Sequence, residues 1–249
     1  MITNFSSIGF MLFKWPGVID ETGRTHYYRM ESTDVNDSNM MLNIQDGTYS
    51  LNKLSCVFQT APNSTVRNGT NSLTVNASAN NYAYLNTGTN LYSDSQTITF
   101  KFNIAPGTFN NTNNFIFVSS YNNNASSNGY LRTCVSGGVH ILSYVFNNPS
   151  TTEVIIQNPF TTGTIHHIAI VKNGRNGGIL FYYNGLLVNT LDNSTIDYKL
   201  FNNSNDNQFF FGRNNIDALY FTGYIDDFRM YSRCLSQEEI NVLRMSRLS

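Results

Sequence analysis

The stretch Thr97–Ile104, which reads TITFKFNI, alternates polar and apolar residues without a break. Successive side chains of an extended chain point to opposite faces, so the two kinds of residue separate completely. One face carries the apolar residues Ile98, Phe100, Phe102 and Ile104, and the other carries Thr97, Thr99, Lys101 and Asn103. This period of two predicts a half-buried strand of an antiparallel sheet.

Further short runs of aromatic and β-branched residues follow along the chain. They are FIFV from Phe115, HILSYVF from His140, EVIIQ from Glu153, HHIAIVK from His166, ILFYYNGLLV from Ile179 and QFFFG from Gln208. Segments rich in Asn, Gly and Ser separate them, and these residue types favour turns. Asn184-Gly185 is the strongest hairpin signal, because both residues adopt positive φ readily. Short strands without intervening helical periods predict an all-β, antiparallel β-sandwich.

The one helix that the sequence predicts is short and lies near the C-terminus. Ser236 and Glu239 have the spacing of a capping box. Leu235 and Ile240 have the spacing of the hydrophobic staple that accompanies such a box. The helix would pack on the sheet through an apolar stripe of Ile240, Leu243 and Met245.

The composition excludes several classes of function. Fifteen basic and sixteen acidic residues give the 249-residue chain a net charge of −1, so a basic surface for nucleic acid is not expected. No run approaches the about 20 apolar residues that a membrane-spanning helix needs. Charged residues make up only 12% of the chain, and the surface is expected to be neutral and rich in Asn.

The cysteines and the N-terminus indicate a reducing compartment. Cys56, Cys134 and Cys234 are an odd number at unpatterned spacings, which predicts free buried thiols and neither disulfides nor a zinc site. The apolar run Ile8–Phe13 is short, contains Gly9 and has no basic leader, so it is a poor signal peptide. We therefore expect synthesis in the cytoplasm without a signal peptide.

The C-terminal third contains GTIHHIAIVKNG, ILFYYNGLLV, QFFFGR and FTGYIDDFRMYSRCLSQEEINVL in that order. These segments resemble the laminin-G-like branch of the concanavalin A-like lectin/glucanase superfamily, in which a WHHIA strand and an lYvNG hairpin precede an F.G.IDDvriYnraLs.eEi segment. The matching residues are His166, His167, Asn184, Gly185, Gly223, Ile225, Asp226, Asp227, Phe228, Arg229, Tyr231, Arg233, Leu235, Ser236 and Glu239. The family's tryptophan before the histidine pair is Ile165 here, and the single tryptophan, Trp15, lies outside the matched region.

The resemblance extends over roughly Thr25 to Leu243, because the segments from His26 and Asn81 resemble the opening strands of the same domain. It implies one concanavalin A-like jelly roll over residues 25–249. Residues 1–24 would form an N-terminal arm.

The superfamily contains glycosidases, so catalysis must be considered. Retaining glycosidases need two carboxyl groups about 5 to 5.5 Å apart, which acids two or four residues apart on one strand would supply. No Glu-x-Asp or Glu-x-x-x-Glu pair occurs. Asp226 and Asp227 are adjacent and are expected on opposite faces, with Asp226 buried as a hydrogen-bond acceptor and Asp227 able to pair with Arg229. The sequence predicts a non-catalytic protein.

A metal site is not assigned. His166 and His167 are expected to face opposite ways on a strand, one in the core and one exposed, so they cannot ligate one ion together. The resemblance leaves calcium open, since some relatives bind Ca²⁺ through loop carboxylates and carbonyls. Candidates by residue type alone are the loop acids Asp192, Asp197, Asp206 and Asp217. No other cofactor is expected.

The leading hypothesis is a lectin-like structural or interaction subunit of a larger assembly, for example a minor capsid component of a virus particle, with protein partners. A surface poor in Lys and Glu favours it, because both types are depleted at protein interfaces. The docking arm would then carry Phe10, Phe13 and Trp15.

The alternative is a free carbohydrate-binding module. Tyr121 and Tyr130 lie near the asparagines 122–124 and are the candidate glycan contacts, because a sugar ring stacks on an aromatic face while amides bind its hydroxyls. A glycoside hydrolase is the third hypothesis. The lack of a visible export signal places the interaction subunit ahead of the free lectin.

Overall fold

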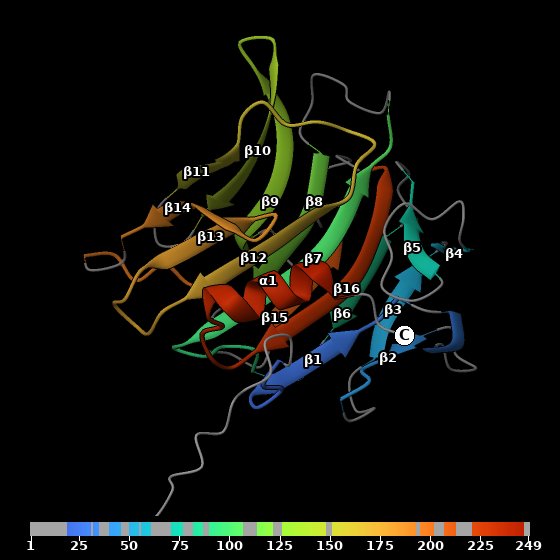
Figure 1. Ribbon diagram of the computed structural model, residues 1–249, viewed down its shortest axis with the longest axis horizontal. Helices are drawn as coiled ribbons and strands as arrows, with labels where there is room; N and C mark the ends of the chain where they lie inside the picture. Colours follow the sequence, from blue (N-terminus) through green and yellow to red (C-terminus); the bar gives the residue numbers. More distant parts are fainter. Residues whose placement is uncertain are drawn as a thin grey trace, which may run out of the picture.

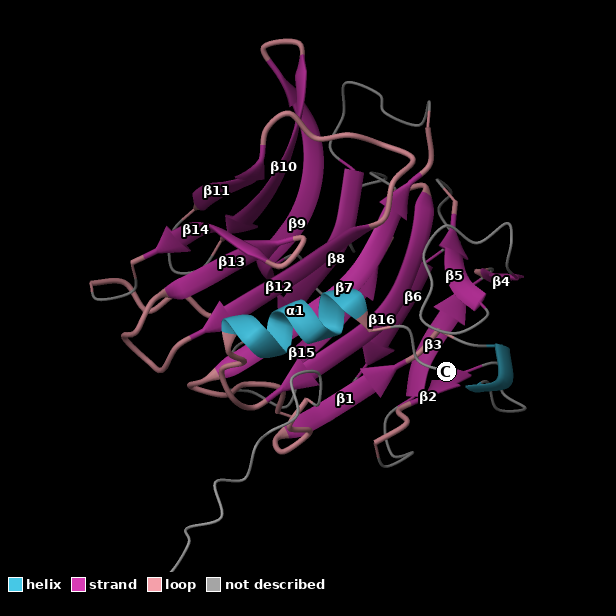
Figure 2. Ribbon diagram, in the orientation of Figure 1, coloured by secondary structure: helices cyan, strands magenta, loops and turns pink. Residues whose placement is uncertain are grey.

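The computed structural model describes residues 19–30, 32–34, 40–45, 50–54, 56–60, 71–76, 82–86, 90–106, 114–121, 126–147, 151–192, 195–201, 207–212 and 221–246. Within these residues the chain forms two antiparallel eight-stranded sheets and one α-helix, α1 (Gln237–Met245). The prediction of an all-β sandwich with a short C-terminal helix is confirmed. Figure 2 shows α1 lying across the strands of one sheet. No helix among the described residues is long and apolar enough to span a membrane.

The first sheet has the order β14-β13-β12-β7-β16-β5-β4, and β1 pairs with a further part of β16. Its strands are β1 (Arg24–Tyr28), β4 (Val57–Thr60), β5 (Asn71–Val75), β7 (Gln96–Ile104), β12 (His166–Lys172), β13 (Ile179–Tyr183), β14 (Leu186–Leu191) and β16 (Gly223–Tyr231). In Figure 1 the green β7 lies between the orange β12 and the red β16, although these strands are far apart in the chain.

The second sheet has the order β11-β10-β9-β8-β15-β6-β3-β2. Its strands are β2 (Met40–Leu42), β3 (Ser50–Leu54), β6 (Tyr82–Asn86), β8 (Asn114–Tyr121), β9 (Ser126–Ser136), β10 (Val139–Phe146), β11 (Thr152–Gln157) and β15 (Asn207–Phe211). The short helical turn η1 (Ser32–Asp34) lies between β1 and β2 in the chain. Each strand run predicted from the sequence corresponds to an observed strand.

Phenylalanines fill the core between the sheets. Phe100 on β7 packs on Phe117 of the opposite sheet, with ring centroids 5.7 Å apart. Phe209 and Phe228 face each other across the same gap at 4.8 Å. All four side chains are fully buried. Such aromatic pairs contribute about 0.5 to 1.5 kcal/mol each beyond the area they bury. The alternation in Thr97–Ile104 is therefore what directs β7 into this core.

The outer face of the first sheet, which points away from the second sheet, is covered as well. Every residue of β7 is buried, including the polar ones. Thr97 Oγ1 donates to Arg233 O at 2.8 Å and accepts from Leu235 N at 3.0 Å. The prediction of a half-buried strand is wrong at this point, because the segment before α1 covers the polar side. Alternation identifies the polar face, but it does not show whether another layer lies on it.

The helix begins as predicted. Ser236 Oγ accepts from Glu239 N at 3.3 Å, and Glu239 Oε2 accepts from Ser236 N at 2.9 Å, which completes the capping box. Ile240 and Leu243 are buried on the outer face, in an apolar cluster with Ala169, Val171, Tyr182, Tyr231 and Leu235. Met245 is 68% exposed, so the predicted apolar stripe ends at Leu243.

The predicted hairpin turn joins β13 to β14. Asn184 and Gly185 both have positive φ, 49° and 81°. Asn184 Oδ1 accepts from His167 N at 2.9 Å, and Asn184 O accepts from Arg244 of α1 at 2.6 Å. A side chain at Gly185 would also approach α1, since a Cβ built there lies 2.3 Å from Asn241 Oδ1. The turn is therefore held between the sheet and the helix.

The beginning of the described chain contacts its end. Residues 19–23 belong to the predicted arm, and Ile19 packs against the apolar cluster beneath α1. Arg233 Nε donates to Thr22 O at 2.7 Å, and Tyr231 donates to Glu21 Oε2 at 3.1 Å. The three aromatic residues proposed for docking, Phe10, Phe13 and Trp15, lie outside the described residues.

The three cysteines are free, as predicted. Full burial holds for Cys56 alone, because Cys134 and Cys234 are only partly covered. Burial raises the pKa of the Cys56 thiol to about 12, so this thiol stays protonated at neutral pH.

Substitution of Gly185 tests the contact between the hairpin and the helix. Gly185→Ala is expected to destabilise the fold by about 1 to 3 kcal/mol, because it combines a positive φ with a clash at Asn241. Gly137→Ala is the matched control, since Gly137 also has positive φ but nothing lies within 4 Å of its added Cβ. Urea unfolding should show a larger loss for Gly185→Ala, and the second change Asn241→Ala should recover part of it. Equal losses at both glycines would contradict the proposed contact.

Candidate functional site

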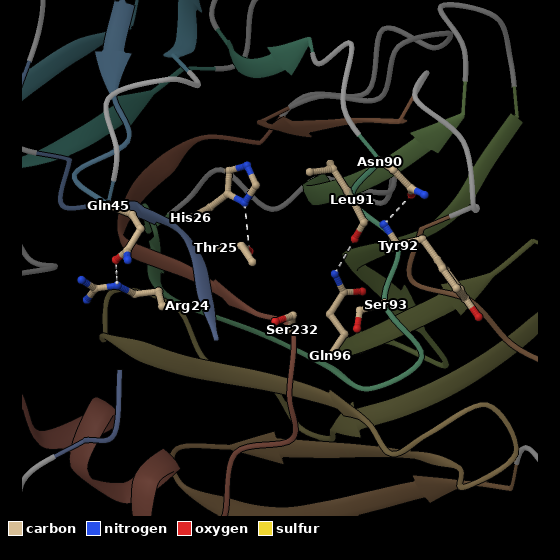
Figure 3. A pocket seen from close by; sticks show the side chains of 10 residues that line it. All are labelled: Arg24, Thr25, His26, Gln45, Asn90, Leu91, Tyr92, Ser93, Gln96 and Ser232. Atoms are coloured by element: carbon tan, nitrogen blue, oxygen red, sulfur yellow. Dashed lines mark hydrogen bonds between the residues drawn. The ribbon is translucent and has the colours of Figure 1, made fainter. Parts of the chain in front are cut away.

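A pocket of about 470 Å³ lies where four parts of the chain meet (Figure 3). Its walls come from β1, from the residues after β2, from the segment leading into β7, and from the residue after β16. The lining residues are Arg24, Thr25, His26, Gln45, Asn90, Leu91, Tyr92, Ser93, Gln96 and Ser232. Because side-chain amides contribute so much of the polar lining, we call it the amide pocket.

Hydrogen bonds hold the walls of the amide pocket in place. Arg24 Nε donates to Gln45 Oε1 at 2.9 Å, which joins β1 to the residues after β2. Gln96 is buried, and its Nε2 donates to the backbone oxygen of Leu91 at 2.8 Å. The Asn90 side chain accepts from the backbone N–H of Tyr92 at 2.9 Å. Figure 3 shows these three bonds on opposite sides of the pocket.

Tyr92 lines the amide pocket, and its ring extends outward, away from the other lining side chains (Figure 3). The side chain is partly exposed, and its hydroxyl donates to Asp94. The Lys199 ammonium lies 5.8 Å from the ring centroid. Burial and the hydrogen bond to Asp94 raise the pKa of Tyr92 to about 12, so the ring is a neutral phenol at physiological pH.

Tyr130, one of the two tyrosines predicted to contact glycans, is not among the described residues that line this pocket. Tyr130 lies on β9, where its ring packs edge-on against Phe115 at 4.8 Å and lies under Arg132 at 5.7 Å. Tyr121 is the last residue of β8, and its side chain and the neighbouring asparagines lie outside the described residues.

The histidine pair shows that β12 is buried on both faces. His166 faces the core, where Tyr183 O–H and His166 Nδ1 are 2.6 Å apart and the Phe160 ring lies at 4.5 Å. His167 faces the outer side and bonds through Nε2 to Thr99 Oγ1 at 2.7 Å. The two do face opposite ways, but the prediction of one exposed histidine is wrong: His167 is only 3% exposed, because α1 and the hairpin turn cover it.

Asp227 and Arg229 form a buried ion cluster with Lys101 on the outer face. Asp227 Oδ1 accepts from Arg229 Nε at 2.8 Å, and Asp227 Oδ2 lies 3.3 Å from Lys101 Nζ. None of the three side chains is more than 5% exposed. Burial opposes the charge on Arg229, but Asp227 together with Tyr27 and Tyr231 outweighs it and holds the pKa of Arg229 above its ordinary value. The predicted pair is confirmed, and it is buried.

A bulge in β16 makes this cluster possible. The register against β7 shifts between Asp226 and Arg229, and Asp227 has a positive φ of 52°. Asp226 stands opposite Lys101, so it shares the outer face, and the Asp227 carboxylate reaches the same face. The prediction that the two aspartates point to opposite faces is wrong because the bulge breaks the alternation. Asp226 is fully buried, as predicted.

A second pocket of about 290 Å³ lies beside this cluster, between the outer face and α1. Its lining residues are Lys101, Ile165, His167, Asn184 and Arg244. Ile165, which replaces the family's tryptophan, is 48% exposed and forms its apolar wall. Because two of the five residues are cations, we call it the cationic pocket.

The described residues contain no cluster of three or more potential metal ligands. Of the loop acids considered for calcium, Asp197 instead binds Lys172 Nζ at 2.9 Å and Lys199 Nζ at 3.6 Å. Asp192 is exposed at the end of β14, while Asp206 and Asp217 lie outside the described residues. Calcium binding stays a prediction.

The sandwich and its sequence motifs can now be compared with known proteins. A family model described as the concanavalin A-like lectin/glucanases superfamily matches residues 76–241. The chain belongs to this superfamily. No curated protein sequence matches the chain. The resemblance inferred from the C-terminal motifs is confirmed.

Solved structures with the same fold include one domain of an arabinanase and binding domains of toxins. One is domain 4 of AbnA, a GH43 extracellular arabinanase from Geobacillus stearothermophilus, in complex with arabinotriose (TM-score 0.62, 16% identity, covering 89% of this chain and 98% of that one). Another is the ligand binding domain of botulinum neurotoxin serotype D in complex with N-acetylneuraminic acid (TM-score 0.61, 18% identity, covering 89% and 50%). A third is the binding domain of botulinum neurotoxin DC in complex with rat synaptotagmin II (TM-score 0.61, 14% identity, covering 89% and 51%). The chain spans about half of the toxin domains, and these identities establish the fold alone.

The sequence did not reveal the amide pocket. Its lining residues come from segments as far apart as Arg24 and Ser232, and no local motif joins them. Tyr92 lies two residues after Asn90, and a tyrosine close to asparagine is the pattern that led to the choice of Tyr121 and Tyr130. That pattern recurs too often along this Asn-rich chain to identify one site.

The buried His167 predicts acid sensitivity. Burial and the nearby cations Lys101, Arg229 and Arg244 lower its pKa from 6.5 to about 3 in the folded state. The unfolded chain therefore binds a proton between these two pH values and the folded chain does not, so stability falls as the pH drops from about 6.5 to about 3. The contribution is at most about 1.4 kcal/mol per pH unit.

Urea unfolding of the wild type and of His167→Gln across this range would measure the effect. Glutamine retains a polar group near Thr99 but does not titrate, so the variant should lose less stability on acidification. Identical pH slopes for the two proteins would contradict the assignment.

Proposed function

We propose that this protein is a non-catalytic carbohydrate-recognition module and that the amide pocket binds the saccharide. The observation that carries the proposal is the lining of that pocket: side-chain amides of Gln45, Gln96 and Asn90 with hydroxyls of serine and threonine. Amides and hydroxyls bind sugar hydroxyls in both directions, as donors and acceptors. The Tyr92 ring extends outward from this lining, so it offers an apolar stacking surface to a part of the saccharide that reaches out of the pocket.

The size and construction of the pocket agree with this proposal. Its volume of about 470 Å³ lies within the range typical of small-ligand sites. Gln96 is buried and anchored to the backbone, so its position is set before a ligand arrives. The arabinanase domain and the toxin domain of the same fold are named with arabinotriose and N-acetylneuraminic acid, which supports carbohydrate as the ligand class.

Binding is preferred to hydrolysis because of the chemistry of the lining. Glycoside hydrolysis ordinarily uses two carboxyl groups that flank the scissile bond. Neither Asp nor Glu is among the described residues that line the amide pocket or the cationic pocket. The groups that are present form hydrogen bonds but offer no acid and nucleophile pair.

A glycan array followed by titration calorimetry tests the amide pocket. Tyr92→Ala should weaken binding of the best glycan about tenfold or more, because it removes the stacking surface. Gln45→Ala should weaken binding by a smaller factor, because this side chain is exposed and one amide is lost.

Tyr130→Ala is the matched control, since it removes a partly exposed tyrosine outside the pocket. If Tyr130→Ala abolishes binding and Tyr92→Ala does not, the site is wrongly placed. If no glycan binds with or without calcium, the function is wrong. Release of reducing ends from a bound oligosaccharide would show a hydrolase.

The second candidate function is an interaction subunit of a larger assembly, and an exposed apolar edge favours it. β14 is the edge strand of the first sheet, and its Leu186, Leu187 and Val188 are 68%, 50% and 38% exposed. Ile155 on β11, the adjacent edge of the second sheet, is 46% exposed. Exposed apolar edge strands favour pairing with other chains. Cytoplasmic synthesis and a place in a virus particle remain predictions of this second function.

Charge substitution on β14 tests the second function. Leu186→Lys with Leu187→Lys should abolish association at this edge while leaving the fold stable, because both side chains already face solvent. Sedimentation velocity of the wild type and the double variant, alone and with isolated assembly partners, measures the change. A monomeric wild type that binds no partner, or partner binding that survives the double substitution, would argue against this role.

A further inference from the structure

His167, which lines the cationic pocket, has a buried ring nitrogen without a protein partner among the described residues. His167 is 3% exposed, and its Nε2 is engaged with Thr99 Oγ1 at 2.7 Å. Its other ring nitrogen, Nδ1, has no hydrogen-bond partner among the described residues, although it is fully buried. A buried polar atom left without a partner is destabilising by about 1 to 3 kcal/mol, so its persistence calls for an explanation.

The protonation state of His167 determines what Nδ1 can offer. Burial, together with the surrounding cations, lowers the pKa of His167 and keeps the ring neutral, so only one nitrogen carries a proton. If the Thr99 hydroxyl donates to Nε2, that proton lies on Nδ1, which is then a donor. In this tautomer Nε2 accepts from Thr99 and Nδ1 can donate to a ligand, both at neutral pH.

Two cations line the same pocket and keep spare donors. Lys101 Nζ donates to Ser246 O at 2.7 Å and contacts Asp227 at 3.3 Å, which leaves one of its three protons. Arg244 is exposed on α1, and its NH1 donates to Asn184 O at 2.6 Å. The guanidinium has five N–H donors in all, so it retains others for a ligand.

We propose that the cationic pocket binds a small oxyanion, either a carboxylate on an acidic monosaccharide or a free phosphate. His167 Nδ1 and Lys101 Nζ would donate to its oxygens from the sheet, and Arg244 would close over it from the helix. Ile165 forms an apolar wall beside this polar end. This site is separate from the amide pocket and does not depend on the carbohydrate proposal for that pocket.

The local charges favour an anion. The lining has two cations and, among the described residues, no carboxylate. The Asp227 carboxylate neutralises only part of the positive charge of Lys101, because it also pairs with Arg229. Charge-assisted hydrogen bonds of this kind are about twice as strong as neutral ones.

The test uses three probes and one spectroscopic reporter on the full chain. Inorganic phosphate, glucuronate and glucose are titrated at constant ionic strength while NMR follows the ring nitrogens of His167. Phosphate or glucuronate should shift Nδ1 saturably with a millimolar Kd, and glucose, which has the same ring without the carboxylate, should not. The anion that binds more tightly shows whether the natural ligand is an acidic monosaccharide or a free phosphate. No saturable shift with either anion, or an equal shift with glucose, overturns the proposal.

Four variants, two at arginines and two at His167, separate ligand binding from a structural role. Arg244→Ala, on the exposed helix surface, should weaken anion binding about tenfold or more. Arg175→Ala is the matched control, because it makes the same charge change at an exposed residue that lines neither pocket. Equal effects at the two arginines would show nonspecific attraction and overturn the site.

His167→Asn and His167→Gln complete the test. Asparagine places its amide near the position of Nδ1 and glutamine places it near Nε2. Anion binding should survive better in His167→Asn, although His167→Gln keeps the bond to Thr99 and should be the more stable protein. If affinity follows stability across the two variants, His167 is a structural residue only. If neither variant folds, the comparison of the two arginine variants decides.

Discussion

The buried ion cluster of Lys101, Asp227 and Arg229 constrains the whole outer face of the first sheet. Charges removed from water are tolerated only where partners and hydrogen bonds compensate them. The three groups provide this for one another, and Lys101 and Arg229 gain further partners in Ser246 and Glu21. Glu21, before β1, and Ser246, after α1, therefore lie over the outer face of the sheet, where they help to bury polar residues of the central strand.

The segments that cover the outer face of the first sheet also form the walls of the two candidate sites. The amide pocket opens where β1 meets the segment leading into β7, and the cationic pocket opens between the hairpin turn and the end of α1. Both lie at edges of the cover and not in the phenylalanine core. The core gives the sandwich its rigidity, and the polar groups that can bind a ligand are held at its margin.

Fold and function are separated clearly in this protein. The same sandwich serves as a domain of an arabinanase and as the binding domain of toxins, so the fold sets a scaffold and the lining residues set the ligand. Here the linings differ: amides and hydroxyls accompany Arg24 and His26 in one pocket, and two cations accompany a neutral imidazole in the other. A chain with a net charge near zero can thus offer two kinds of recognition, because the charge is distributed locally.

The sequence by itself determined the strands, the hairpin at Asn184-Gly185, the capping box at Ser236 and the superfamily, because each of these depends on residues that are close together in the chain. Periodicity placed Phe100 in the core and identified the polar face of β7. It could not show that His167 is buried, that Asp226 and Asp227 share a face, or that Arg24 and Tyr92 line one pocket. Those features depend on a bulge, on a covering helix and on contacts between residues far apart in the chain, and only the tertiary structure decides them.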